Sequence, residues 1–102
     1  MRSERAAYAA FLAATDTARQ RRELWQQALG TALATDRRDQ YRAALSAVTE
    51  ALNLVRLEGP DTVTTAAEAL EHALEVSPPP SQHPGAHAAF LDAARAALAT
   101  AP

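Results

Sequence analysis

Apolar and polar residues alternate with a helical rhythm between Asp39 and Pro60. The apolar positions recur at spacings of four and three, which places them on one face of an α-helix. They are Tyr41, Leu45, Val48, Leu52 and Val55. Polar residues repeat on another face, namely Asp39, Arg42, Ser46, Thr49, Asn53 and Arg56. Gly59 and Pro60 should end this helix, because proline donates no backbone hydrogen bond and restricts the residue before it. The pattern predicts a helix over residues 37–58.

A longer helix is predicted before it, over residues 3–34, with Ser3 as its cap. Its face follows the same rhythm through Tyr8, Phe11, Thr15, Ala18, Arg22, Trp25, Leu29 and Ala32. A short connection near Thr35 and Asp36 should make the two helices an antiparallel hairpin. Facing residue numbers would then sum to about 71, which puts Trp25 near Leu45 and Arg22 near Glu50.

The two predicted helices differ in length. At 1.5 Å per residue the first would be roughly 48 Å long and the second roughly 33 Å. The first helix would therefore overhang the second before about Ala13. Tyr8, Phe11 and Leu12 lie on this overhang, so we expect later helices or a second copy of the chain to cover them.

Two shorter helices complete the predicted fold. The third covers residues 60–76 and the fourth residues 84–100, with a Pro-rich linker over residues 77–85 between them. The apolar residues of the third are Val63, Ala66, Ala67, Leu70, Ala73 and Leu74, and its polar residues Glu68, Glu71, His72 and Glu75 are expected to face away. The fourth is anchored by Phe90, Leu91, Ala94 and Leu98. The predicted fold is a single all-α domain resembling a four-helix bundle, in which the long hairpin is covered by the two shorter helices.

Composition narrows the classes of function. The chain has 102 residues and a net charge of −2, so no overall field favours nucleic acid or anionic lipid. The absence of cysteine excludes disulfides, thiolate metal sites and cysteine nucleophiles. The sequence shows neither the apolar core of a signal peptide nor the ~20 apolar residues of a membrane span. We therefore expect a cytoplasmic protein without a membrane span.

The charges are unevenly distributed along the chain. Residues 1–58 carry a net +2 and residues 59–102 a net −4, so the two halves should attract each other or a partner. Six arginines of the first half could form a basic patch: Arg19, Arg21, Arg22, Arg37, Arg38 and Arg42. Acidic residues such as Glu23 and Asp36 interrupt this patch, which argues against nucleic-acid binding. A nucleic-acid-binding regulator remains the alternative function.

The residues do not predict a catalytic or metal site. His83 and His87 are four apart, as are Glu68 and His72, and such pairs can share a metal on a helix. A third ligand at a diagnostic spacing is missing, so we predict no metal and no cofactor. We also expect no enzyme activity, because a nucleophile–base pair and a phosphate-binding loop are both missing. Trp25 is interpreted as a core anchor, with a small-ligand pocket beside it as a further alternative.

Three segments resemble small uncharacterised bacterial helical domains, chiefly actinobacterial. They are Arg5-x-x-Tyr8-x-x-Phe11-Leu12, then Val55-Arg56-Leu57-Glu58-Gly59-Pro60-x-x-Val63, then Phe90-Leu91-x-x-Ala94-Arg95. The resemblance implies an all-α domain and supplies no catalytic residue. The absence of lysine and isoleucine, with abundant alanine and arginine, also suggests a GC-rich, actinobacterial genome.

The apolar overhang and the charge split together predict a helical protein–protein interaction or self-association module. Tyr8, Phe11 and Leu12 would form its interaction surface. The expected partner is another protein or a second copy of the chain, giving a homo-oligomer.

Overall fold

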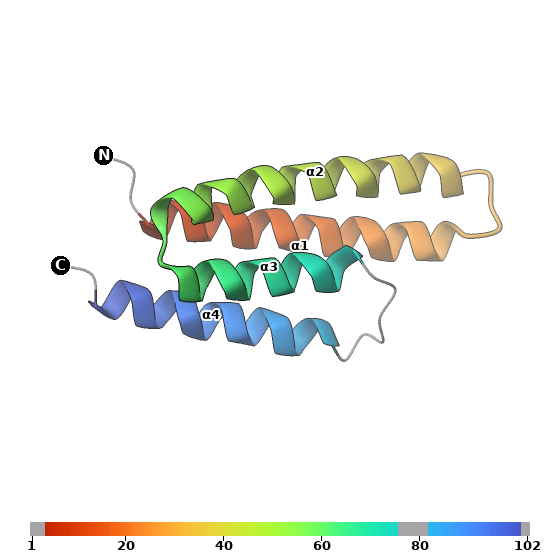
Figure 1. The fold of residues 1–102 in the computed structure, drawn as a ribbon. Coiled ribbons are helices and arrows are strands. Elements are labelled where there is room, and N and C mark those ends of the chain that lie inside the picture. Colours follow the sequence, from red (N-terminus) through yellow and green to blue (C-terminus); the bar gives the residue numbers. More distant parts are fainter. Residues whose placement is uncertain (1–3, 76–81, 101–102) are drawn as a thin grey trace.

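The computed structural model describes residues 4–75 and 82–100, and this part of the chain forms four α-helices without a strand (Figure 1). They are α1 (Glu4–Ala28), α2 (Ala34–Glu58), α3 (Asp61–Glu75) and α4 (Gln82–Thr100). The prediction of an all-α fold is confirmed. α4 begins within the predicted linker, whose residues 77–81 lie outside the described residues, as do the predicted cap Ser3 and the predicted end of the third helix at Val76. In the described ranges, no helix combines the length and the apolar character that crossing a membrane requires.

α1 and α2 form the predicted antiparallel hairpin, but their turn comes earlier than predicted, at residues 29–33. Gly30 has a φ of 83°, a left-handed conformation that costs glycine little and commonly ends a helix. The Thr31 hydroxyl donates to the carbonyl of Ala28 at 2.6 Å and accepts the amide of Leu33 at 3.2 Å. The early turn shortens α1, so both helices have 25 residues.

The equal helix lengths remove the predicted overhang. Tyr8 is 3% exposed and Phe11 is completely buried. Their rings contact that of Phe90 in α4, with centroids 6.1 and 4.9 Å apart. Leu12 is half-buried against the same core. The prediction that these residues form an interaction surface is therefore wrong for Tyr8 and Phe11, because α4 of the same chain covers them.

The early turn also changes which residues face each other. The Trp25 ring stacks on that of Tyr41, with centroids 5.7 Å apart, whereas Leu45 was the predicted neighbour. Arg22 does not pair with Glu50 but donates to a backbone carbonyl of α3. The predicted register is wrong because its turn was placed several residues too late.

α3 packs against both helices of the hairpin, and α4 packs against α3 and α1 (Figure 1). The largest completely buried side chains are Phe11, Phe90, Leu52, Leu74, Val48, Val55 and Val63. They form one core along the part of the hairpin that α3 and α4 cover. Beyond the end of α3, the hairpin continues without a helix over it, as Figure 1 shows. We call this projecting part, residues 23–40, the free end.

The chain reverses between α2 and α3 at Gly59, whose amide donates to the carbonyl of Val55 at 2.8 Å. A Cβ atom at Gly59 would lie 2.8 Å from the Tyr8 hydroxyl oxygen and 3.1 Å from the Val55 carbonyl oxygen. Both separations are shorter than ordinary van der Waals contact. Glycine is therefore needed here because α1 approaches closely. The backbone conformation does not require glycine, because any residue can adopt its φ of −108°.

The Tyr8 hydroxyl donates to the Glu4 carboxylate at 3.1 Å. Burial raises the pKa of Tyr8 to about 12, and the bond to Glu4 acts in the same direction. Tyr8 therefore stays neutral at physiological pH and serves as a core residue.

Candidate protein-interaction surface

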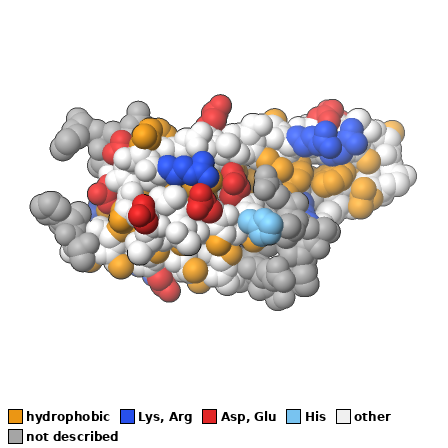
Figure 2. Space-filling view, viewed as in Figure 1, with side chains coloured by type: hydrophobic (Ala, Val, Ile, Leu, Met, Phe, Trp, Pro, Cys, Tyr) orange, Lys and Arg blue, Asp and Glu red, His pale blue; other side chains and the backbone are white. Residues whose placement is uncertain are grey.

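Three leucines at the free end are exposed to solvent. Leu24 is 37% exposed, Leu29 60% and Leu33 53%. Single exposed leucines are common on protein surfaces, but three lie here near the same end of the hairpin. Figure 2 shows hydrophobic and basic side chains close together over this end. We call these three residues the leucine tip. Leu57, which is 82% exposed, lies at the opposite end of α2.

The base of the free end is fixed to α3. The guanidinium of Arg22 donates to the carbonyl of Leu74 at 3.3 Å, and the Tyr41 hydroxyl donates to the same oxygen. Leu74 lies in the last turn of α3, where carbonyls lack an intrahelical donor and a cation is favoured by the helix dipole. Trp25, which belongs to the free end, stacks on Tyr41. We call Arg22, Tyr41 and Leu74 the α3 anchor.

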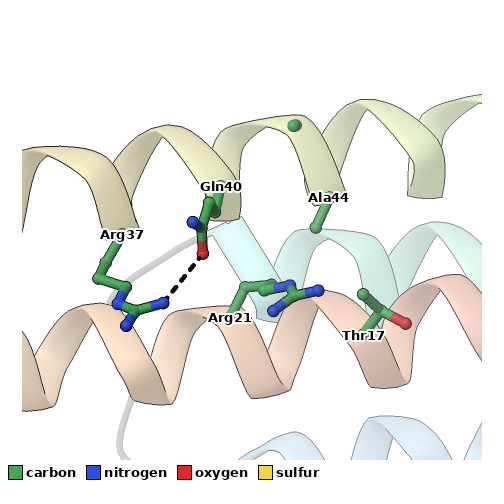
Figure 3. Close-up of a pocket in the computed structure, with 6 residues that line it drawn as sticks. Thr17, Arg21, Arg37, Gln40 and Ala44 are labelled. Carbon is green, nitrogen blue, oxygen red and sulfur yellow. Dashed lines mark hydrogen bonds between the residues drawn. The ribbon is translucent and has the colours of Figure 1, made fainter.

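An open groove of about 490 Å³ runs between α1 and α2. It is lined by Thr17, Arg21, Arg37, Gln40, Ala43 and Ala44. In Figure 3, α3 lies behind the hairpin, so the groove is on the face that α3 leaves uncovered. Arg37 reaches from α2 towards α1, along which Arg21 extends (Figure 3). We call this feature the arginine groove.

The arginine groove carries positive charge without a matching carboxylate. Arg37 donates to the amide oxygen of Gln40 at 3.4 Å, and Thr17 donates to a carbonyl of its own helix at 3.1 Å. Among the residues that the structure describes, no carboxylate pairs with Arg21 or Arg37. Ala43 and Ala44 provide a floor of small side chains, of which that of Ala44 is only 9% exposed. The groove therefore suits a ligand that brings carboxylates to its sides and apolar groups to its floor.

The six predicted arginines do not form one patch. Arg19 binds Asp16 on its own helix. Arg22 is only 8% exposed and belongs to the α3 anchor. Each is held by its own contact, so neither joins Arg21 and Arg37 in lining the arginine groove.

Arg38 and Arg42 lie on a different flank of α2 from Arg37. At 3.6 residues per turn, these two positions are rotated from Arg37 by about 100° and 140° about the helix axis. The Arg38 Nε atom lies 3.9 Å from the Asp39 carboxylate. The structure thus brings together two of the six arginines, Arg21 and Arg37, in one groove.

Two residues of the acidic face predicted to point away from the bundle, Glu68 and Glu71, lie at the surface and also contact α2. Glu68 accepts a hydrogen bond from Arg56 at 2.9 Å, and Glu71 accepts one from Thr49 at 3.0 Å. Helical periodicity showed that these residues share a face, but it could not show that the face lies beside α2. The side chain of Glu75 lies outside the description.

The other candidate sites gain little from the structure. Within the described ranges, no three histidine, aspartate or glutamate side chains are grouped for a metal ion. The side chain of His83 lies outside these ranges, and His87 is half-buried. Trp25 stacks on Tyr41 and is not among the residues that line the arginine groove.

The sequence alone did not indicate the leucine tip or the arginine groove. A prediction of the turn at Gly30 would have placed Leu29 and Leu33 at the end of the hairpin, where side chains have few neighbours. Comparisons with protein-family models, curated proteins and solved structures found no match to this chain. The resemblance to small actinobacterial helical domains therefore stays a prediction.

Proposed function

We propose that this chain is a helical protein–protein interaction module that acts through the free end of the α1–α2 hairpin. The observation that carries the proposal is the exposure of Leu24, Leu29 and Leu33 at one end. The other large apolar side chains are mostly packed in the core that the four helices share. The proposal includes self-association through the leucine tip and assigns no catalytic role.

The strength of this self-association follows from the exposed area. The exposed fractions of the leucine tip amount to about one and a half leucine side chains, worth about 2–5 kcal/mol when buried. Two tips contribute twice this amount, and association costs at least about 4 kcal/mol of translational and rotational freedom. Self-association through the tip alone should therefore be weak and concentration-dependent.

The test is sedimentation velocity over a concentration series. The average mass of the wild-type chain should rise with concentration, and Leu29→Ser with Leu33→Ser should remove this rise. Leu57→Ser is the matched control, because Leu57 is more exposed but lies at the other end of α2. A wild-type chain that stays monomeric throughout, or an equal effect of the control, would refute self-association through the tip.

Nucleic-acid binding is the second proposal, supported by Arg21 and Arg37 lining one groove. Each phosphate contact lowers the logarithm of affinity by about 0.9 per unit of log salt on duplex DNA. Two arginines would give a slope of about −2 and correspondingly weak binding. Absence of binding to a duplex oligonucleotide at low salt would eliminate this alternative.

A further inference from the structure

The hairpin already holds one acidic amphipathic helix, which is its own α3. The apolar side of α3 contributes Val63, Leu70 and Leu74 to the core. Its polar side brings Glu68 to Arg56 and Glu71 to Thr49 of α2. α3 thus shows the chemistry that this hairpin uses to hold a helix: an apolar seam with carboxylates beside it, facing arginine and threonine.

The arginine groove repeats these groups on the opposite face. Arg21 and Arg37 provide the guanidinium groups, Thr17 the hydroxyl, and Ala43 with Ala44 a floor of small side chains. Small side chains allow two helix axes to approach to about 8–10 Å. The face therefore has the charge and the shape to receive another helix.

Two members of the leucine tip extend this surface towards the turn. Leu24 follows Arg21 by three residues, and Leu33 precedes Arg37 by four. Residues three or four apart are neighbours on a helix surface, and Leu33 is the N-cap of α2, whose carbonyl accepts the Arg37 amide at 3.0 Å, so each leucine continues the flank that bears the arginine. An apolar seam longer than the alanine floor would contact these leucines.

We propose that the arginine groove binds an amphipathic α-helix of a partner protein, with glutamate or aspartate residues flanking its apolar seam. This inference rests on the proposed function, because it assigns a partner to the same hairpin. The carboxylates pair with Arg21 and Arg37, while the seam packs on the alanine floor and on Leu24 and Leu33. Insertion of an amphipathic helix into an apolar groove is an established mode of peptide recognition.

The groove fits a helix better than a nucleic-acid backbone. Phosphate binding depends on the number of cationic contacts, and only two arginines line the groove. Alanine and leucine side chains would gain little from a phosphate backbone, whereas they would bury the seam of a helix. The combination of charge with an apolar floor therefore points to a protein partner.

The test uses fluorescence anisotropy with a labelled synthetic peptide of about 18 residues, which spans roughly 27 Å as a helix. The peptide has a leucine seam flanked by glutamates, and the control peptide has glutamine at those positions. The wild-type chain should bind the glutamate peptide, and added salt should weaken this binding. The glutamine peptide should bind at least about tenfold more weakly.

Charge reversal in the groove tests the site itself. Arg21→Glu with Arg37→Glu should weaken binding of the glutamate peptide by at least about tenfold. The matched control is Arg5→Glu with Arg95→Glu, which changes net charge equally at exposed positions on α1 and α4 outside the groove lining. The control should change affinity by less than about twofold, since distant exposed charges are screened by salt. Circular dichroism checks that each variant folds. If a charge-reversal variant is unfolded, the arginines of both pairs are changed to glutamine and not to glutamate.

Four outcomes would overturn the inference: no peptide binding at low salt, equal binding of both peptides, equal losses in both charge-reversal variants, or displacement of the peptide by a DNA duplex. If unlabelled chain displaces the peptide, and this displacement requires Arg21 and Arg37, the groove binds a second copy of the chain and not a partner protein. Sedimentation of the same samples separates this inference from the proposed function. Self-association that depends on the leucine tip, without peptide binding, would overturn the inference alone. Loss of both would overturn the proposed function as well.

Discussion

The α3 anchor allows a sharp comparison between two adjacent arginines. Arg22 is 8% exposed and donates to the Leu74 carbonyl, whereas Arg21 is exposed and lines the arginine groove. Arg22→Ala removes a buried, charged donor together with a packed aliphatic stem. Arg21→Ala removes the same atoms from the surface. The pair therefore separates the effect of burial from that of residue type.

The expected magnitudes differ clearly. Hydrogen bonds from charged groups contribute about 1.5–3 kcal/mol, and the lost packing of the stem adds to this, so Arg22→Ala should cost about 2–4 kcal/mol. Arg21→Ala should change the free energy of unfolding by less than about 0.5 kcal/mol. For a chain of about 100 residues, each kcal/mol shifts Tm by about 4–8 °C. Arg22→Ala should therefore lower Tm by at least about 8 °C.

A double-mutant cycle with Tyr41→Phe tests the shared acceptor. Either donor alone still satisfies the Leu74 carbonyl, but loss of both leaves it without these two donors. Leaving a buried carbonyl without a donor costs more than losing one of two bonds. The double variant should thus be less stable than the sum of the single changes by about 0.5–1.5 kcal/mol.

Urea unfolding followed by circular dichroism measures all of these free energies. Hydrogen exchange should also show faster opening at the last turn of α3 in the Arg22→Ala variant. If Arg22→Ala costs no more than Arg21→Ala, the α3 anchor does not stabilise the fold. Strict additivity in the cycle would mean that the two donors act separately.

Three further predictions concern the core. Gly59→Ala should lower the free energy of unfolding by about 1–3 kcal/mol, because the new Cβ would collide with the Tyr8 hydroxyl. Gly85→Ala should be neutral or stabilise by up to about 1 kcal/mol, because a Cβ at that position would lie in open space. Equal effects of the two changes in urea unfolding would contradict this. The free energy of unfolding should fall by about 2 kcal/mol between pH 10 and 12, because the folded state keeps the Tyr8 proton that the unfolded state loses. Tyr8→Phe should remove this fall from a pH titration of stability, and an unchanged profile would show that Tyr8 does not cause it. Phe90→Ala should cost about 3–5 kcal/mol by leaving a cavity beside Phe11, and a cost below about 1 kcal/mol in urea unfolding would argue against this packing.

The seams of apolar residues predicted the four helices because a helical face must be buried somewhere. The position of the first turn was missed because Leu29, Ala32 and Leu33 continue the helical rhythm past Gly30. A glycine costs a helix interior only about 1 kcal/mol, so the pattern alone favoured an unbroken helix. Because of that error the predicted first helix was too long, and Tyr8 and Phe11 were predicted to lie on an uncovered overhang.

Contacts between segments that are distant along the chain could not be predicted from the sequence. A buried arginine needs an acceptor, but nothing in its local pattern indicated that Arg22 would bind a carbonyl 52 residues away. The arginine groove likewise depends on the register of α1 and α2, which an error of a few residues in the turn alters. The sequence showed which residue types the candidate site contains, but only the folded structure shows which of them lie together.

The contact of α4 with α1 also affects how the chain is made. Phe90 covers Tyr8 and Phe11, although it follows them by almost the whole described length of the chain. On the ribosome, α1, α2 and α3 emerge before α4, and domains complete their core only when all its segments are present. The aromatic face of α1 is therefore exposed during synthesis and becomes buried when α4 docks. A chain truncated before α4 would keep that face open, and aggregation of such nascent or truncated chains follows from the same packing that closes the finished core.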